Sequence, residues 1–249
     1  MLKVFDAAGE IEVPEDLGSL NHLKYFCIKA FELETEVPTS IGMLENLETL
    51  DLTGWYWRHD IPTNSMEDQS DESDEYIDLD LDLPKLQYLV LDGQLEKLPE
   101  WIQKLQNLVK LKLVSSKLTE DSMKLLKSRP NLLSISLMEN AYVGETLHFQ
   151  NEWFKNLKEL YLDDLDNLKD ILIDQGALPS LKKFNIHSVS VLQLKTIPTG
   201  IRHLKKLEDL SISVVGDKFM RNLLLNGGKD HWIFKQVPFV EIKDRRVSL

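Results

Sequence analysis

The stretch Leu157-Lys-Glu-Leu160-Tyr-Leu162 contains the pattern that decides the fold: apolar, two residues of any kind, apolar, one residue of any kind, apolar. In a short strand, Leu160 and Leu162 point to one face and the residue between them points to the other. The pattern occurs nine times, and all 27 of its positions are apolar. The nine copies begin at Leu2, Leu23, Leu47, Leu86, Leu108, Leu132, Leu157, Leu181 and Leu207.

The spacing of the copies indicates a repeat protein. Successive copies lie 21, 24, 39, 22, 24, 25, 24 and 26 residues apart, and all but one interval fall within the range of about 20–29 residues of leucine-rich repeats. One copy cannot bury its leucines alone, but stacked copies share a continuous core. We therefore expect an α/β solenoid: a leucine-rich-repeat horseshoe with about nine parallel strands on the concave face and irregular, 3-10 or short helical segments on the convex side.

The segments between the strands carry a second pattern, in which a proline is followed by apolar residues three and six positions later. It occurs four times, from Pro14, Pro38, Pro99 and Pro198. Proline fixes φ at a helical value. It has no N–H, but the N–H groups of the first helical turn have no partner within the helix, so nothing is lost there. The pattern therefore predicts short 3-10 or α turns. A fuller helix is expected after Thr119, the predicted N-cap residue, with its end before Pro130.

The net charge of −12 is concentrated in one segment. Nine acidic residues and no Lys or Arg lie between Pro62 and Lys85, which leaves a net charge of −3 for the remainder. This charge argues against binding to nucleic acid or to an anionic membrane surface. A single cysteine excludes an internal disulfide framework. With neither a signal peptide nor a membrane-spanning run, the chain is expected to be cytoplasmic, and peripheral association of a longer receptor with the plasma membrane remains open.

We divide the chain into a leucine-rich-repeat domain over residues 1–216 and a C-terminal cap over residues 217–249. The acidic insertion, residues 62–83, interrupts the repeats and is predicted to be mobile. No capping segment precedes Leu2, so the chain is expected to be the C-terminal piece of something longer, with a first strand edge open to self-association.

The side chains that alternate with the repeat leucines are expected to form a binding surface. They combine Tyr and Met with charges of both signs, which is typical of protein contact surfaces. The candidate partner-binding residues on this face are Tyr25, Cys27, Asp51, Tyr88, Lys110, Lys112, Met138, Glu159, Tyr161, Asp163 and His187. Cys27 is expected to be a free surface thiol. Trp55 and Trp57 flank Tyr56, and because alternation cannot bury all three rings, this cluster is the sharpest single hypothesis for a protein contact.

Motifs of catalysis or metal binding are absent from the sequence. It has no nucleophile elbow, His-Glu-x-x-His or Cys-x-x-Cys, and its six histidines lack the spacing of zinc ligands. The run from Asp78 to Leu83 fails the EF-hand pattern at positions six and twelve. We therefore expect no enzymatic activity, no metal ion and no cofactor in this chain.

Three stretches resemble one known family. They are Val37-Pro-Thr-Ser-Ile-Gly-Met-Leu-Glu-Asn-Leu47, Ile197-Pro-Thr-Gly-Ile-Arg-His-Leu-Lys-Lys-Leu207 and the tail that begins Asp230-His-Trp232. They are similar to the repeats and the C-terminus of plant intracellular immune receptors, the coiled-coil NB-ARC-LRR disease resistance proteins (NLRs) of the RPM1-like type. The likeness extends over nearly the whole chain.

The resemblance implies a role in plant innate immunity. The partners it implies are a pathogen effector or a guarded host protein, together with the receptor's own nucleotide-binding (NB-ARC) module. ADP or ATP is expected only in that module, because this chain has no phosphate loop. Two alternatives are a stand-alone intracellular repeat scaffold, against which the uneven intervals count, and a ubiquitin-ligase substrate adaptor, which would need an F-box-like segment that this sequence does not contain.

Overall fold

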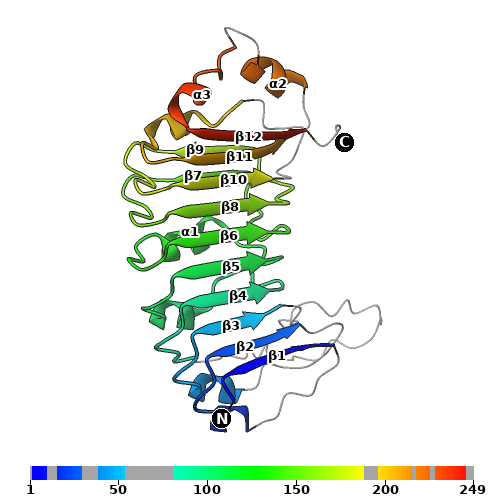
Figure 1. The fold of residues 1–249 in the computed structure, drawn as a ribbon, viewed down its shortest axis with the longest axis vertical. Helices are drawn as coiled ribbons and strands as arrows, with labels where there is room; N and C mark the ends of the chain where they lie inside the picture. The colour runs from blue at the N-terminus through cyan, green and yellow to red at the C-terminus, as the bar shows by residue number, and fades with distance from the viewer. Residues whose placement is uncertain are drawn as a thin grey trace, which may run out of the picture.

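The computed structural model describes residues 2–9, 16–29, 39–53, 81–187, 196–214, 217–224 and 228–244. Within them, ten parallel strands form one sheet in the order β1-β2-β3-β4-β5-β6-β8-β10-β11-β12, and all ten arrows point the same way in Figure 1. The strands are β1 (Val4–Ala8), β2 (Tyr25–Lys29), β3 (Thr49–Leu52), β4 (Tyr88–Asp92), β5 (Lys110–Val114), β6 (Ser134–Met138), β8 (Glu159–Asp163), β10 (Lys183–His187), β11 (Asp209–Val214) and β12 (Phe239–Asp244).

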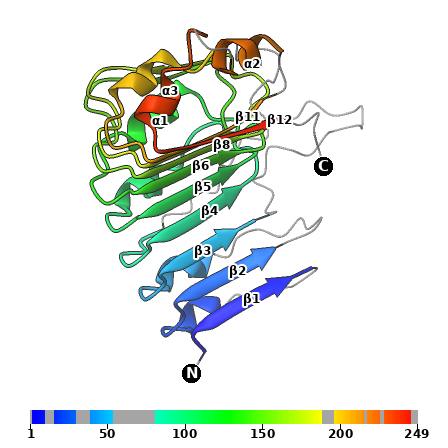
Figure 2. The same ribbon diagram turned by 45° about the horizontal axis from the view of Figure 1, so that its top comes forward.

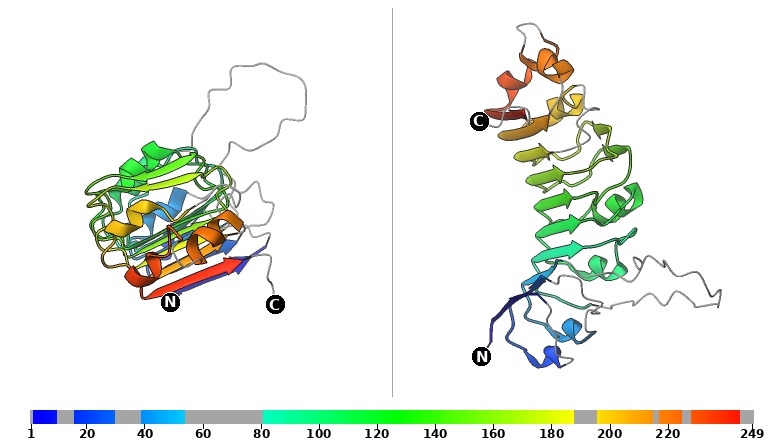
Figure 3. Two further views of the ribbon diagram at one scale, coloured as in Figure 1. Left: turned by 90° about the horizontal axis from the view of Figure 1, so that it is seen from above. Right: turned by 90° about the vertical axis from the view of Figure 1, so that its right-hand side faces the viewer.

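The predicted solenoid is confirmed. Each of the nine predicted strands begins two residues after the leucine that opens its copy of the pattern. The sheet curves along the stack (Figure 2), with the strands on the concave side and the helical turns on the convex side (Figure 3, right). The tenth strand, β12, was not predicted, although Val237, Val240 and Ile242 repeat the same spacing. Its residues lie within the segment that the sequence analysis assigned to a C-terminal cap.

One continuous core runs through the solenoid. The pattern leucines from the third copy onward, for example Leu47, Leu50 and Leu52, are fully buried and belong to a single apolar cluster. At the first coil, the ring of Phe5 stacks on that of Phe26 with centroids 5.4 Å apart. Burial of a leucine side chain stabilises the folded state by about 1.5–3 kcal/mol, so the repeated core is the main source of stability.

The convex side is built largely as predicted. Four 3-10 turns follow the proline pattern: η1 (Leu17–Ser19), η2 (Thr39–Met43), η3 (Glu100–Lys104) and η4 (Thr199–His203). Helix α1 (Glu120–Leu126) begins after Thr119 as expected, but the Thr119 side chain makes no capping hydrogen bond. Two further strands, β7 (Thr146–Phe149) and β9 (Asp170–Ile173), pair in parallel in a separate small sheet that the sequence did not predict.

Asparagines fasten successive coils at the turns that lead into the strands. Each stands immediately before the first leucine of its repeat and donates from its side-chain Nδ2 to a backbone carbonyl of the preceding coil. The pairs are Asn107 to Pro84 at 2.7 Å, Asn131 to Gln106 at 2.9 Å, Asn156 to Pro130 at 2.8 Å and Asn46 to Asn21 at 2.7 Å. These carbonyls would otherwise face solvent at the edge of the stack, so the bonds add specificity to the apolar stacking.

In the described residues, three side-chain contacts link the C-terminal segment to the η4 coil, in addition to the pairing of β12 with β11. This segment contains α2 (Asp217–Leu224), α3 (Ile233–Gln236) and β12. The Asp230 carboxylate accepts a hydrogen bond from the Ile197 backbone N–H at 3.2 Å, and the Gln236 amide donates to the Ile201 carbonyl at 2.9 Å. The Arg202 guanidinium lies 4.3 Å from the centroid of the Trp232 ring. None of the helices in the described part of the chain combines the length and apolar character needed to cross a bilayer.

Asp230 is buried, and desolvation raises its pKa above the ordinary value of 3.8, against the lowering effect of the bond from Ile197. A carboxyl with a raised pKa in the folded state binds its proton more tightly there, so ionisation of this group opposes folding at neutral pH. That unfavourable contribution disappears as the pH falls through the raised pKa toward 3.8. Asparagine can accept the same hydrogen bond without carrying the charge.

We therefore expect Asp230→Ala to lower the stability by about 1–3 kcal/mol, because it leaves the buried Ile197 N–H without an acceptor. Asp230→Asn is expected to remain within about 1 kcal/mol of wild type at pH 7. As the pH falls from 7 to 4, wild type should gain stability relative to Asp230→Asn, because the unfavourable charge of Asp230 is then lost. Thermal unfolding of the three proteins across this pH range checks the sign. A pH-independent difference, or an alanine variant as stable as wild type, would contradict the expectation.

Candidate protein-binding surface

Strand register arranges the concave side chains in rows that cross the sheet. The first row is Val4, Tyr25, Thr49, Tyr88, Lys110, Ser134, Glu159, Lys183, Asp209 and Phe239. The second row is Asp6, Cys27, Asp51, Val90, Lys112, Ser136, Tyr161, Asn185, Ser211 and Glu241. A third row includes Asp92, Val114, Met138, Asp163 and His187. All eleven candidate residues within the described part of the chain therefore lie on one face.

Tyr25, Asp51 and Tyr88 form an aromatic and acidic cluster at the N-terminal end of this face. One Asp51 oxygen accepts from both the backbone N–H and the hydroxyl of Thr53, at 3.1 and 2.5 Å, which fixes the carboxylate. Desolvation raises the pKa of Tyr25 to about 12, and desolvation together with Asp51 raises that of Tyr88. Both phenols are therefore protonated at neutral pH and present hydroxyl groups and ring faces beside a fixed negative charge.

The prediction that Cys27 is a surface thiol is wrong. It does stand in the second concave row, but its side chain is only 1% exposed. In that row it lies between Asp6 and Asp51, and Tyr25 lies two residues before it on the same face; its thiol interacts with all three side chains. Val90, between Asp51 and Lys112, is buried in the same way. Desolvation, with the nearby Asp51 charge, raises the pKa of the Cys27 thiol to about 11.

A basic position and an acidic position lie in the middle of the face, separated by serines. In the first row Lys110 and Glu159 are both neighbours of Ser134, and two strand spacings amount to about 10 Å. No ion pair joins the two side chains in the described part of the chain. Tyr161, in the second row on the same strand as Glu159, has its pKa raised by burial and then by Glu159. This part of the face thus offers opposite charges and an aromatic ring to a partner.

His187 takes part in a polar chain at the C-terminal end of the face. Its Nε2 lies 3.0 Å from the Ser211 hydroxyl, and that hydroxyl donates to Glu241 at 3.1 Å. In a nucleophilic triad the imidazole accepts the serine proton and a carboxylate orients the imidazole. Here the Ser211 hydroxyl donates to the carboxylate, which differs from the order of a triad, and the three side chains hold one another in place on the surface.

Two further sequence hypotheses concern sites elsewhere. Trp55 and Trp57, and the acidic insertion apart from its last three residues, lie outside the described residues. Within the described ranges, no three His, Cys, Asp or Glu side chains are grouped closely enough to hold a metal ion.

Sequence reasoning missed a groove along the edge where the strands begin, because its polar lining residues do not belong to the apolar pattern.

A family model described as a leucine-rich repeat region matches residues 59–222. The chain belongs to the leucine-rich repeat family. Among curated proteins it is 31% identical over 156 residues to the disease resistance protein RPM1 of Arabidopsis thaliana, covering 63% of this chain and 16% of that protein. It is 30% identical over 157 residues to the putative disease resistance protein At1g59780 of the same plant, covering 63% of this chain and 16% of that protein.

The likeness to RPP8-like protein 2 of Arabidopsis thaliana, a probable disease resistance protein, is longer: 25% identity over 202 residues, covering 81% of this chain and 21% of that protein. This leucine-rich repeat chain thus spans about a fifth or less of the length of these relatives. The family resemblance found in the sequence is confirmed. Among solved structures, the plant peptide hormone receptor RGFR1 in complex with RGF2 is similar at 18% identity and a TM-score of 0.36, covering 87% of this chain and 35% of that chain.

The burial of Cys27 gives a direct chemical expectation. At pH 8 a thiol of pKa about 11 is ionised in roughly one molecule in a thousand, and only the thiolate reacts. We expect native Cys27 to react with a thiol reagent at least about a hundredfold more slowly than the same residue in denaturant. The matched control is Cys27→Ser with Ser136→Cys, which puts a thiol at a half-exposed position of the same row and should react rapidly. Equal rates at the two positions would refute the burial.

Proposed function

We propose that the chain is the protein-recognition module of a plant disease resistance protein, and that its concave face binds a protein. The observation that supports this most is the set of rows across the sheet, where tyrosines and charges of both signs are held on neighbouring strands. Tyr88 and Tyr161 are half-buried rings near fixed charges, which is the environment typical of binding hot spots. The relatives, which carry the name disease resistance protein, supply the biological setting.

In the proposed mechanism the repeat region keeps the receptor inactive by holding its nucleotide-binding module closed. A pathogen effector or a modified host protein would displace that contact. A ligand shifts such an equilibrium only through its differential affinity for the two states, so it must bind the released state better than the closed one. ADP or ATP would bind in the nucleotide-binding module, and this chain would contribute recognition without catalysis, in the cytoplasm or at the cytoplasmic side of the plasma membrane.

The concave face is divided electrostatically in a way that suits selective recognition. Asp6 and Asp51 lie toward the N-terminal end, Lys110 and Lys112 follow on β5, and Glu159 comes two strands later. Charges arranged in blocks favour a partner with the complementary order and disfavour one with like charges opposite. Tyr88, on β4 between Asp51 and the two lysines, and Tyr161, on the same strand as Glu159, provide contact area that does not depend on charge.

To test the proposal, Tyr88→Ala and Tyr161→Ala are introduced together into the complete receptor expressed in leaf tissue. Loss of two anchor rings is expected to weaken a concave contact by about 2 kcal/mol or more, roughly thirtyfold. The receptor should then either trigger cell death without an effector, if the closed state depends on the face, or fail to respond to its effector. Leu125→Ala, an exposed apolar residue on convex helix α1, is the control. Wild-type behaviour of the double variant at equal protein level would refute the proposal.

A further inference from the structure

The two long edges of the sheet carry opposite charges. Because the strands are parallel, every turn that leads into a strand lies at one edge and every turn that follows a strand lies at the other (Figure 1). The leading turns from β4 to β8 contain Lys85, Lys104, Lys127, Arg129, Lys155 and Lys158. The following turns contain more acids than bases: the exposed acids Glu96, Glu139, Asp164 and Asp166 lie there, with Lys97 and Lys117. We name the edge formed by the leading turns the basic edge.

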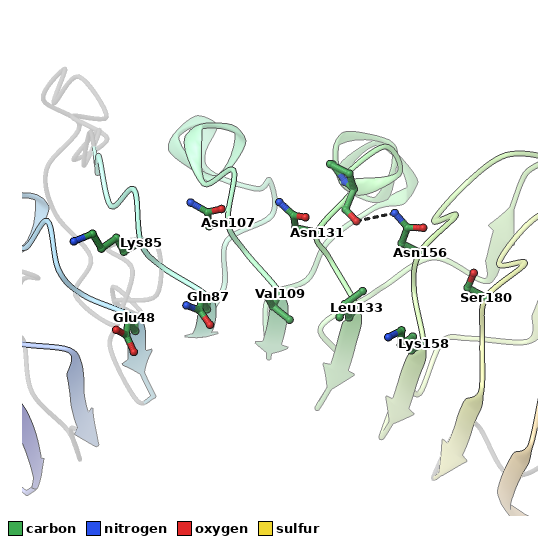
Figure 4. A pocket seen from close by; sticks show the side chains of 11 residues that line it. Glu48, Lys85, Gln87, Asn107, Val109, Asn131, Leu133, Asn156, Lys158 and Ser180 are labelled. Carbon is green, nitrogen blue, oxygen red and sulfur yellow. Dashed lines mark hydrogen bonds between the residues drawn. The ribbon is translucent and has the colours of Figure 1, made fainter.

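The basic edge is hollowed. A groove of about 610 Å³ runs along it from Glu48 to Ser180, and a second hollow of about 400 Å³ adjoins it at Pro130 and Asn156. Figure 4 shows the side chains that line the groove. They come from the segments that lead into β3, β4, β5, β6, β8 and β10. The residues that line the two hollows include five basic and two acidic side chains: Lys85, Lys127, Arg129, Lys155 and Lys158, with Glu48 and Glu152.

Both acids that line the two hollows are already paired. Glu48 forms an ion pair with Lys24, and Glu152 forms one with Lys155 at 3.3 Å. Arg129 donates to the backbone carbonyls of Leu105 and Ile102 at 2.8 and 2.7 Å, which holds the guanidinium in place and leaves its charge without a counterion. In the described ranges, no carboxylate forms an ion pair with Lys127, Arg129 or Lys158. The groove therefore has an excess of positive charge.

The neutral part of the lining favours a polypeptide. Asn107, Asn131 and Asn156 each use one amide N–H to fasten the preceding coil, and each amide has a second N–H and an oxygen with which it can bind a peptide group. Val109 and Leu133, half-exposed between them, supply an apolar floor. A nucleic acid would gain little from these apolar side chains, because its binding depends chiefly on phosphate contacts.

We propose that the groove and the adjoining hollow together form a docking site for an acidic segment of a partner protein. Carboxylates of the segment lie near Lys127, Arg129 and Lys158, its backbone pairs with the asparagine amides, and its apolar side chains rest on Val109 and Leu133. The site is separate from the concave face, whose side chains point away from the edge, and so it does not depend on the function proposed above.

The test uses a fluorescein-labelled peptide made of repeated Glu-Leu-Asp-Ser units and a control peptide of Gln-Leu-Asn-Ser units. Fluorescence anisotropy with the intact chain is expected to show binding of the acidic peptide that weakens with added salt, and at least tenfold weaker binding of the amide peptide, about the effect of losing several surface charge pairs. The double substitution Lys127→Glu and Lys158→Glu should weaken binding of the acidic peptide about tenfold or more. Lys97→Glu with Lys117→Glu makes the same charge change at the opposite edge of the sheet and should change the affinity by less than about twofold.

Three results would overturn the proposal. Equal losses in the two double variants, both shown to be folded by circular dichroism, would mean that net charge alone attracts the peptide. Binding of a single-stranded oligonucleotide as tight as that of the acidic peptide would identify a general polyanion surface. Equal binding of the acidic and amide peptides would show that the lysines make no contribution. Each of these results leaves the tyrosine test of the concave face unaffected.

Discussion

The fold depends on one constraint: each coil has to be covered by the next. The leucines of one copy of the pattern are left partly open until the following coil closes over them, and the parallel strands then pair at a spacing of about 4.8 Å. Once this spacing is set, every side chain that alternates with a leucine has a fixed neighbour in the adjoining strands. The rows containing Tyr88 and Tyr161 follow directly from that register, so the surface is as regular as the core beneath it.

This constraint also explains which features the sequence could predict. Strand positions depend on a local pattern, and nine of them followed from leucine spacing alone. The neighbours of Cys27 in its row, Asp6 and Asp51, lie about one repeat away in either direction. A local sequence pattern therefore cannot predict how far that side chain is buried. Strand β12 has the same spacing, but valines take the place of leucines and a longer segment precedes it, so the copy beginning at Val237 was overlooked.

Polar residues at fixed repeat positions proved as informative as the apolar ones. Asn107, Asn131 and Asn156 recur directly before a leucine, and each bonds to the preceding coil. A search restricted to apolar positions passes over them and over the lysines beside them. The charged edge and its groove follow from the same periodicity, because a parallel solenoid brings all residues at one repeat position to one side. Their contacts across coils, however, emerge only in three dimensions.

A stacked solenoid also limits how the proposed switch can operate. Neighbouring coils are joined by backbone hydrogen bonds, shared leucines and asparagine contacts, so a coil cannot rotate without breaking several of these together. A large change of shape within the repeats would therefore cost more than a typical surface ligand supplies. Release of a bound module is then best explained by competition for a surface. A concave face and a basic edge on one rigid frame allow one partner to be retained at the edge while another is exchanged on the face.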